Sequence, residues 1–316
     1  MLELNKLYLM DCMEGMKHIP DKSVNLIISD PPYFRVKGKF DFVWESFDDY
    51  LADVERWAKE CKRVLSENGT LYWFGGAKRI AYTQIILDKY FGLVNSLVWE
   101  NTNDHKQQIR FNEDLRSYAP LTERILMYSN DVYNLTQCVY NIRDYIRDEI
   151  KRARGEIVFK EINAALGTAI NGGGVASACL SLHKAEPAMF TKDMYQKLRE
   201  WLNSVDEYEY LRKEYEDLRR PFDNFLHLGD VIRLPNRESI NHEHETVKPE
   251  KLSRILIKTS SRENDLVLVP FAGSGTECAM AVKEGRRFIG FEIDEDYHKA
   301  ATKRIEIHKQ QLKLFC

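Results

Sequence analysis

The stretch LVLVPFAGSGTECAMAVKEGRRFIGFEID, residues 266–294, decides the fold that we expect for this chain. Its apolar run at 266–269 predicts a buried strand, the glycines at 273 and 275 predict a turn, and residues 277–284 have the composition of a helix. A second apolar run at 287–294 predicts another strand. A strand, a turn, a helix and a second strand form a unit in which the two strands lie parallel in one sheet.

The glycine turn of this unit predicts a site for a nucleotide-type ligand. Glycine lets the backbone approach a ligand closely, and the turn leads directly into a helix N-terminus. Glu292 ends the second strand 17 residues after Gly275. A carboxylate about 20 residues beyond the turn is expected to accept the ribose hydroxyls. The positions expected to bind the cofactor in this unit are Phe271, Gly273, Ser274, Gly275, Thr276 and Glu292.

The turn differs from both fingerprints that bind phosphate groups. A P-loop needs Lys and then Ser or Thr after its last glycine, where this chain has Thr276 and Glu277. The third glycine of the dinucleotide fingerprint is also missing. S-adenosylmethionine is the remaining nucleoside cofactor without a phosphate, and its sulfonium carries an electrophilic methyl group. S-adenosylhomocysteine would be the product, and no metal is needed for such a transfer.

A second motif, VNLIISDPPY at residues 24–33, predicts a group that would take this methyl. The apolar run at 24–28 predicts a buried strand that ends at Asp30, Pro31, Pro32 and Tyr33, our candidate catalytic residues. Prolines have no N–H, so bare carbonyl acceptors lie beside a carboxylate. An amino group that gives its hydrogens to Asp30 and the Pro31 carbonyl loses conjugation with its ring, and its lone pair can attack; Tyr33 would stack on that ring. The alternative is an ordinary turn that leaves the sheet.

Asp-Pro-Pro-Tyr paired with Phe-x-Gly-x-Gly resembles the amino-group DNA methyltransferases, and the order of the two motifs is that of the β class. The resemblance covers residues 1–130 and 225–316. It implies an α/β, Rossmann-like, doubly wound and mostly parallel sheet, S-adenosylmethionine as the methyl donor, and double-stranded DNA with a flipped base as the substrate. A second copy of the chain and a cognate restriction endonuclease are further partners that the resemblance leaves open.

Three more positions gain an expected role from this resemblance. Asp11 is similar to the acid that receives the adenine amino group of the cofactor, although a cap on a helix at 13–18 is the alternative. Residues 244–249, HETVKP, are similar to the family segment His-Pro-Thr-x-Lys-Pro, which implies that Thr246 and Lys248 hold the methionine end of the cofactor. Asp30 counts among the cofactor contacts as well. Val269 stands where the family usually has Asp, which removes one expected polar contact.

The residue at position 30 bears on the methylated base. Family members that act on cytosine N4 often carry Ser there, so Asp30 favours N6 of adenine. Three alternatives stay open: an N4-cytosine DNA methyltransferase, a non-catalytic DNA-binding regulator whose cofactor site has decayed, and an RNA or protein amide methyltransferase. The amide enzymes carry Asn where this chain has Asp30, which argues against the last of them.

Residues 131–224 do not fit the methyltransferase pattern and predict a helical insert. Helices are expected at 140–154, 156–166 and from 175 to 182, with the cadence of a helix-turn-helix module. Since β-class enzymes carry their target-recognition region here, we interpret the insert as the DNA sequence reader. A module that only braces the core or a partner subunit is the alternative.

Two basic loops are candidate DNA contacts. The loop at 34–40 interleaves cations with aromatic rings, which suits phosphates and unstacked bases, and the polar, basic loop at 102–110 would contact phosphates. Their residues are Arg35, Lys37, Lys39, Lys106 and Arg110. Solvated loops that only aid solubility are the alternative. The formal net charge of the chain is −3, so a DNA surface would have to be a local basic patch.

Composition and spacing restrict the remaining possibilities. A chain of 316 residues suggests one large α/β domain and a smaller one. Six cysteines without CxxC spacing favour reduced structural thiols. The His and Glu residues at 242–245 lack the geometry of a metal site, and no metal is expected. No apolar run reaches the ~18 residues of a membrane span and no targeting signal is present, so we expect a cytoplasmic protein.

Overall fold

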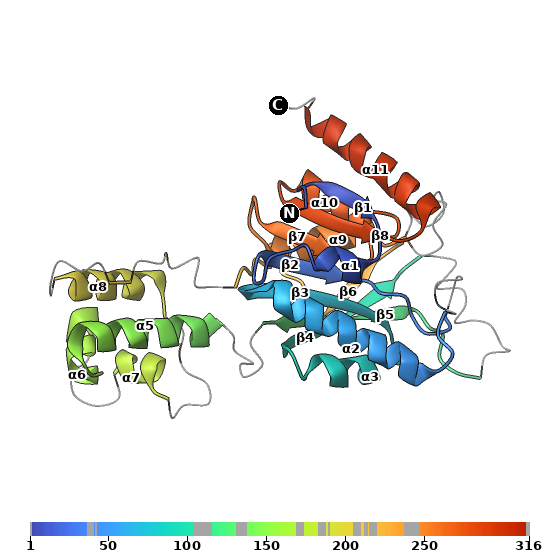
Figure 1. Cartoon of the computed structure of the whole chain (residues 1–316). Helices are drawn as coiled ribbons and strands as arrows, with labels where there is room; N and C mark the ends of the chain where they lie inside the picture. The colour runs from blue at the N-terminus through green and yellow to red at the C-terminus, as the bar shows by residue number, and fades with distance from the viewer. Residues whose placement is uncertain are drawn as a thin grey trace. The chain divides into compact units, whose positions relative to one another are not determined.

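The structure is a computed structural model of the chain (Figure 1). It describes residues 2–36, 41, 43–103, 116–130, 138–168, 174–182, 188, 190–204, 210–211, 214, 220–236 and 247–313. The chain divides into two compact units. Unit 1 comprises Met1–Tyr133 and Pro221–Cys316, and unit 2 comprises Asn134–Arg220.

Unit 1 is built on an eight-stranded sheet with the strand order β1-β8-β7-β2-β3-β5-β4-β6. Neighbouring strands are parallel, except that β5 runs antiparallel to both β3 and β4. The predicted doubly wound, mostly parallel sheet is therefore confirmed. The strands are β1 (Lys6–Leu9), β2 (Val24–Ser29), β3 (Leu65–Gly76), β4 (Gly92–Asn101), β5 (Thr122–Ser129), β6 (Val231–Leu234), β7 (Leu266–Val269) and β8 (Arg287–Glu292).

Helices cover both faces of this sheet (Figure 1). Side chains alternate along a strand, so Ile27 and Trp73 pack against one group of helices while Leu26 and Tyr72 pack against the other. The first group is α1 (Cys12–Met16), α2 (Phe47–Val64) and α3 (Ile80–Leu87). The second group is α9 (Glu250–Ser260), α10 (Thr276–Lys283) and α11 (Glu295–Lys313). Unit 1 is thus a sheet between two helical layers with a hydrophobic core on each face.

Helix α2 illustrates how the sequence sets these elements. Ser46 Oγ accepts a hydrogen bond from the Asp49 N–H at 3.1 Å, and the Asp49 carboxylate accepts one from the Ser46 N–H at 3.0 Å. This reciprocal cap satisfies donors that the first turn of a helix leaves free. The buried side chains of the helix recur at steps of three and four residues, so one stripe faces the sheet. They are Tyr50, Val54, Trp57, Ala58, Cys61 and Val64.

The predicted unit at 266–294 forms β7, the glycine turn, α10 and β8. Gly275 precedes α10 with φ of 73°, a left-handed conformation that favours glycine. A Cβ at this position would lie 2.8 Å from the Cβ of Ala301 in α11. Close packing of α11 therefore adds a second reason for glycine here.

Unit 2 contains α5 (Cys138–Arg154), α6 (Phe159–Leu166), α7 (Val175–Leu180) and α8 (Lys192–Asn203). Its own hydrophobic core includes Ile146, Ile162, Leu180 and Leu198. Helices α5, α6 and α7 correspond to the regions 140–154, 156–166 and 175–182 where the sequence predicts helices, whereas α8 was not predicted. The helix-turn-helix interpretation of α6 and α7 stays a prediction, because residues 169–173 between them lie outside the described part of the chain.

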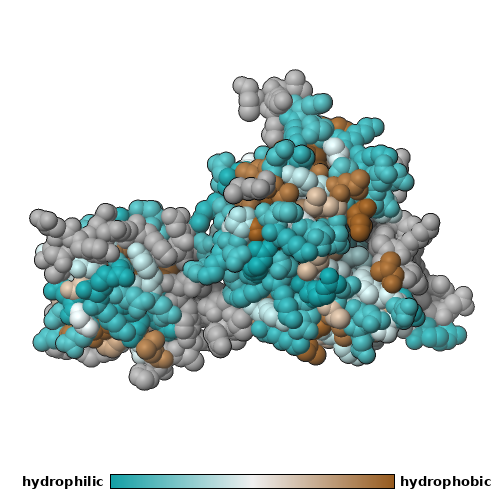
Figure 2. All heavy atoms as spheres, viewed as in Figure 1, coloured by the Kyte–Doolittle hydropathy of each residue, from teal (hydrophilic) through white to brown (hydrophobic). Residues whose placement is uncertain are grey.

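The surface in Figure 2 is mainly hydrophilic, with hydrophobic residues in small groups. Within the described residues, every helix is too short or too polar to cross a membrane. Cys12, Cys61 and Cys278 in this part of the chain are free and buried, and Cys179 is also buried.

Candidate active site

Both motifs lie at the carboxyl edge of the sheet, where α/β proteins of this type bind ligands. Strand β2 ends at Ser29, directly before Asp30, and strand β7 ends at Val269, directly before the glycine turn. The two strands are neighbours, with Leu26 opposite Val267. Residues more than 200 positions apart in sequence, such as Asp30 and Gly273, therefore follow adjacent strand ends.

Asp30 belongs to a network of four polar side chains, which we call the Asp30 cluster: Asp30, Tyr33, Glu123 and Lys248. The Tyr33 hydroxyl donates to Asp30 Oδ1 at 2.8 Å and approaches Glu123 Oε2 at 3.3 Å. Lys248 Nζ lies 2.9 Å from Asp30 Oδ2 and 3.0 Å from Glu123 Oε2. Each oxygen of the Asp30 carboxylate thus has a donor from within the protein.

Lys248 is the buried cation of this cluster, since only 6% of its surface is exposed. Burial by itself lowers the pKa of Lys248, but the carboxylates of Asp30 and Glu123 outweigh this and raise it well above the ordinary value. Burial and the same two carboxylates also raise the pKa of Tyr33. At neutral pH the cluster therefore holds a charged lysine and a neutral tyrosine.

The main chain around the cluster is fixed by further hydrogen bonds. The carboxylate of the buried Asp41 accepts from the N–H of Tyr33, which secures the turn after the two prolines. The Asn236 side chain donates to the carbonyl of Val247 at 2.7 Å, and its own N–H donates to Asn101 Oδ1 at 3.2 Å. Asn101 ends β4, so these asparagines hold the segment before Lys248 at the carboxyl edge of the sheet.

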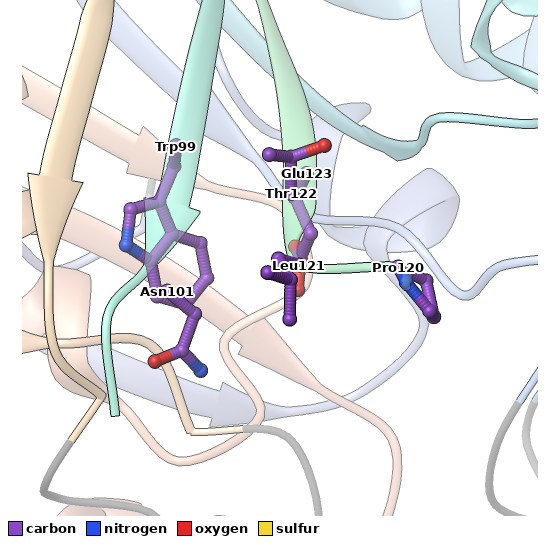
Figure 3. A pocket seen from close by; sticks show the side chains of 6 residues that line it. All are labelled: Trp99, Asn101, Pro120, Leu121, Thr122 and Glu123. Atoms are coloured by element: carbon purple, nitrogen blue, oxygen red, sulfur yellow. The ribbon is translucent and has the colours of Figure 1, made fainter. Parts of the chain in front are cut away.

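Glu123 was not foreseen from the sequence. It is the second residue of β5, and β5 runs opposite to its neighbours, so the beginning of β5 lies beside the ends of the parallel strands. The antiparallel direction of β5 was not predicted. An acid at the start of this strand therefore gave no indication that it would lie at the site. Glu123 also lines a cavity of about 60 Å³ (Figure 3). The cavity is lined by Trp99, Asn101, Pro120, Leu121, Thr122 and Glu123.

Glu277 is, after Glu123, the second acid near the site that was not predicted as a site residue. In the sequence it only marked the difference from a P-loop. It lies in the first turn of α10, is 5% exposed, and accepts a hydrogen bond from the Ser253 hydroxyl at 2.9 Å. Burial, and then the charge of Asp30, raise the pKa of Glu277. The carboxyl group therefore retains its proton to a higher pH than an exposed glutamate does.

The other end of the site is formed by the ends of β1 and β8. Glu292 Oε2 accepts from the Gly273 N–H at 2.7 Å and Glu292 Oε1 accepts from the Asp294 N–H at 2.9 Å. Burial raises the pKa of Glu292, although these amide donors oppose the effect. Asp11 follows β1, and its Oδ1 accepts from the N–H groups of Met13 at 2.8 Å and Glu14 at 3.3 Å. The helix-cap role of Asp11 is thus present, and a role toward the cofactor stays a prediction.

The remaining residues of the glycine turn are held by packing and by each other. The Phe271 ring meets the Trp57 ring edge to face at 4.9 Å. The hydroxyls of Ser274 and Thr276 lie 3.0 Å apart, and Thr276 is fully buried. Pro31 is buried and Pro32 is partly exposed. Every described site residue of the two motifs therefore lies on or next to the carboxyl edge.

Some expected site residues lie outside the described part of the chain, namely Thr246, Lys37, Lys39, Lys106 and Arg110. Arg35 is described and exposed, and its guanidinium donates to the carbonyl of Glu45 at 2.9 Å and lies 5.0 Å from the centre of the Phe34 ring. Its contact with DNA stays a prediction. Among the residues that the structure describes, no group of three or more His, Cys, Asp or Glu could hold a metal ion.

Comparisons with known proteins agree with this geometry. The DNA adenine methyltransferase YhdJ of Escherichia coli K12 is 28% identical over 302 residues, which cover 94% of this chain and 81% of that protein. The Type II methyltransferase M.HinfI of Haemophilus influenzae is 27% identical over 320 residues, covering 96% of this chain and 68% of that protein.

Two solved structures share the fold. The PvuII DNA methyltransferase, described as cytosine-N4-specific, matches with a TM-score of 0.56 and 15% identity, covering 95% of this chain and 85% of that one. The complex of M1.HpyAVI with S-adenosylmethionine matches with a TM-score of 0.51 and 18% identity, covering 95% and 98% of the two chains. The family model of the N6 and N4 type, described as DNA methylase, matches residues 24–303. The chain therefore belongs to the N6/N4 family of DNA methylases.

Proposed function

We propose that this protein transfers a methyl group from S-adenosylmethionine to the exocyclic N6 of adenine in DNA. The observation that carries the proposal is the position of Asp30, which directly follows the buried strand β2, precedes Pro31, and lies next to the end of β7, the strand that leads into the glycine turn. An acceptor for an amino group and a turn suited to a nucleoside thus lie at one edge of the sheet. That arrangement suits direct transfer between two bound molecules.

The residues of the site fit this cofactor. Glu292 is held at the end of β8 with its carboxylate against the glycine turn, where it can accept ribose hydroxyls. Asp11 follows β1, which pairs with β8, and the N–H of Met10, which lies between β1 and Asp11, donates to the carbonyl of Glu292 at 2.9 Å. Asp11 would accept the adenine amino group of the cofactor, and Thr246 with Lys248 would contact its methionine end. When bound, the cofactor supplies an electrophilic methyl on a sulfonium.

The chain's own residues would prepare the target base for attack. Asp30 and the carbonyl of Pro31 would hold the two amino hydrogens, which orients the nitrogen lone pair toward the methyl. Tyr33 would stack on the base, which leaves the duplex at a cost of a few kcal/mol. The nitrogen attacks directly and then loses a proton, so no covalent enzyme intermediate forms. Most of the acceleration would come from positioning two reactants.

Adenine is favoured over cytosine by Asp30, because cytosine-N4 enzymes of the family often have Ser at this position. The relative named a DNA adenine methyltransferase supports the same choice. The PvuII enzyme, described as cytosine-N4-specific, is similar in fold at 15% identity and does not bear on the base.

The test is to identify the modified nucleoside. The protein is incubated with unmethylated genomic DNA and S-adenosylmethionine carrying a deuterated methyl, and the DNA is digested and examined by mass spectrometry. Labelled N6-methyl-2′-deoxyadenosine is expected among the deoxynucleosides. Labelled N4-methyl-2′-deoxycytidine instead would establish the cytosine alternative, and the absence of any label would reject methyl transfer to DNA.

A non-catalytic DNA-binding regulator is the second candidate, and Val269 is the observation that favours it. This residue is 1% exposed and apolar where the family usually has an acid. Calorimetry separates the two functions, because a regulator with a decayed site would bind DNA without binding S-adenosylmethionine.

Unit 2 would read the DNA sequence in either case. Its described helices α5, α6, α7 and α8 surround a hydrophobic core within the unit, so it can present a binding surface of its own. The other partners that we propose are a second copy of the chain and a cognate restriction endonuclease. Sequencing that detects modified bases in cells expressing the protein would reveal the recognition sequence.

A further inference from the structure

We propose that Lys248 occupies the amino-binding oxygen of Asp30 until the target base enters, and that Glu123 then receives the displaced ammonium group. In this view Lys248 and Glu123 are positioning residues that act on the catalytic carboxylate. The proposal rests on the function proposed above, because it assumes that Asp30 must accept the amino group of a base.

Both carboxylate oxygens of Asp30 already have a partner within the protein. Its Oδ1 accepts from Tyr33 at 2.8 Å and its Oδ2 lies 2.9 Å from Lys248 Nζ. An incoming amino group must therefore displace or share one of these donors. Lys248, which pairs with Oδ2, comes from a segment more than 200 residues farther along the chain, whereas Tyr33 belongs to the same turn as Asp30 and moves with it.

The lysine needs another partner when it leaves Asp30. The side chain of Lys248 is only 7% exposed, and an ammonium group that left Asp30 without another partner would be a buried, uncompensated charge. Glu123 Oε2 already lies 3.0 Å from Nζ, so a small rotation keeps the ion pair while it frees Asp30. The rings of Tyr33 and Phe74, whose centres lie 5.7 and 5.3 Å from Nζ, face the cation along this path.

The charges of the Asp30 cluster do not cancel. Asp30 and Glu123 carry two negative charges and Lys248 carries one positive charge, while the Tyr33 hydroxyl is neutral. The net negative charge favours a cationic methyl donor and the positive charge that develops on the attacking nitrogen. Without Glu123, the lysine would pair fully with Asp30, which would neutralise the carboxylate and keep its oxygen occupied.

Glu123 has space beside it. Protein interiors are close-packed, so a side chain can shift only where a void or the solvent adjoins it. Glu123 lines the cavity of about 60 Å³ at the end of β4 and the start of β5, and a third of its side chain is exposed (Figure 3). The carboxylate that would receive the lysine therefore has room to follow it.

Glu123→Gln is the variant that tests the proposal, since it keeps the shape of the side chain and removes its charge. We expect kcat for DNA methylation to fall about 100-fold, as when a reacting group is misplaced. The affinity for S-adenosylmethionine, measured by calorimetry, should stay within threefold. The kcat of Glu123→Asp should be at least tenfold higher than that of Glu123→Gln, because the charge of the side chain matters and its exact length does not.

The decisive measurement is the double variant Glu123→Gln with Lys248→Met. If Glu123 acts by drawing the lysine away from Asp30, removal of the lysine should recover at least tenfold in kcat relative to Glu123→Gln alone. A residue that merely stabilised the fold would give no such recovery. Thermal unfolding of each variant checks that the fold is retained.

Glu284→Gln is a matched control. Glu284 is also a poorly exposed glutamate paired with two cations, Arg254 at 2.6 Å and Lys258 at 3.8 Å, but it follows the C-terminal end of α10, away from the carboxyl edge. The kcat of Glu284→Gln should equal that of the unchanged protein.

The outcomes separate this inference from the proposed function. If the unchanged protein methylates no DNA, the proposed function fails and this inference fails with it. If the unchanged protein methylates DNA but Glu123→Gln keeps its kcat within threefold, or the double variant is no faster than Glu123→Gln, only the role of Glu123 and Lys248 is overturned.

Discussion

At the scale of single residues, the proposed chemistry depends on the carboxylate of Asp30. Asp30→Ala removes the acceptor for the amino group, so methyl transfer should fall by at least about 100-fold. Binding of S-adenosylmethionine should be partly retained, because Glu292 and the glycine turn are unchanged. A radiolabelled methyl-transfer assay and calorimetry measure the two effects. Asp21→Ala, at an exposed ion pair with Arg63 before β2, should leave the rate as it is. Near-normal transfer by Asp30→Ala would reject the assignment.

The buried Glu277 gives a prediction about pH. Because its pKa is raised by burial and by Asp30, the folded chain holds this proton above the pH at which the unfolded chain releases it, about 4.3. The contribution of Glu277 to the free energy of unfolding therefore falls as the pH rises from about 4 through the raised pKa of the folded chain. Glu277→Gln cannot lose the proton and can still accept from Ser253, so its unfolding free energy should exceed that of the unchanged protein at pH 8, and the difference should shrink at pH 5.

Urea unfolding at the two pH values measures this difference. Glu14→Gln is the control with the opposite sign, since the hydrogen bond from Lys17 lowers the pKa of the exposed Glu14. A group whose pKa is lowered by folding stabilises the folded chain at a pH above its pKa in the unfolded chain, and this stabilisation is lost on acidification. At pH 8 the free energy of unfolding of Glu14→Gln should therefore not exceed that of the unchanged protein. An unchanged or lower stability of Glu277→Gln at pH 8 would contradict the buried-carboxyl explanation.

The residues that the sequence analysis named and those that it missed differ in physical type. Asp30 and the glycines stand in short motifs whose neighbours along the chain fix their geometry. Glu123 gains its place only when β5 pairs antiparallel between β3 and β4. Lys248 was expected near the cofactor, which stays a prediction, and the structure shows it paired with Asp30 and Glu123. Contacts between distant segments are what local patterns do not encode.

At the scale of elements, the turn before α10 is constrained twice. Gly275→Ala would place a Cβ in the left-handed region, at about 1 to 2 kcal/mol, and also 2.8 Å from the Cβ of Ala301. We expect a clear loss of unfolding free energy in urea and weaker binding of S-adenosylmethionine.

The matched control for this turn is Gly285→Ala. Gly285 has a similar φ of 74°, but the nearest atom to its added Cβ is Glu263 Cγ at 3.8 Å, an ordinary contact. In this variant the free energy of unfolding should fall only by the cost of placing an alanine in the left-handed region, and S-adenosylmethionine should bind normally. Equal losses in the two variants would show that the packing of α11 on the turn is unimportant.

The elements themselves were largely predictable, because hydrophobic periodicity determines them locally. The runs at 266–269 and 287–292 and the helical spacing of α2 needed no tertiary information. The direction of β5 and the presence of α8 were not predicted. Helix α8 buries Tyr195, Leu198 and Leu202 at steps of three and four, so its pattern was present but no motif drew attention to it.

At the scale of the whole molecule, the two compact units, whose hydrophobic cores are separate, imply two unfolding events. Leu198 is fully buried in unit 2, so Leu198→Ala should destabilise that unit by about 2 to 5 kcal/mol. S-adenosylmethionine binding by unit 1 should persist, whereas sequence-specific methylation should be lost. Differential scanning calorimetry with and without the cofactor measures both.

Leu268→Ala is the corresponding change in the core of unit 1, where Leu268 is fully buried in β7. It should weaken cofactor binding as well as stability. If Leu198→Ala abolished cofactor binding to the same degree, the two units would unfold together, and the independent role of unit 2 would be wrong.

The strand order has a consequence for synthesis on the ribosome. Strand β1 lies at the edge of the sheet and pairs with β8, and β2 has β7 as one neighbour. The first strands to emerge must therefore wait for the last to be translated, and such distant pairing is slow. Until then β2 presents an open edge, the kind of surface on which nascent chains aggregate. A premature stop after residue 265 would leave a chain that exposes this edge permanently, so chaperone demand should be highest late in translation.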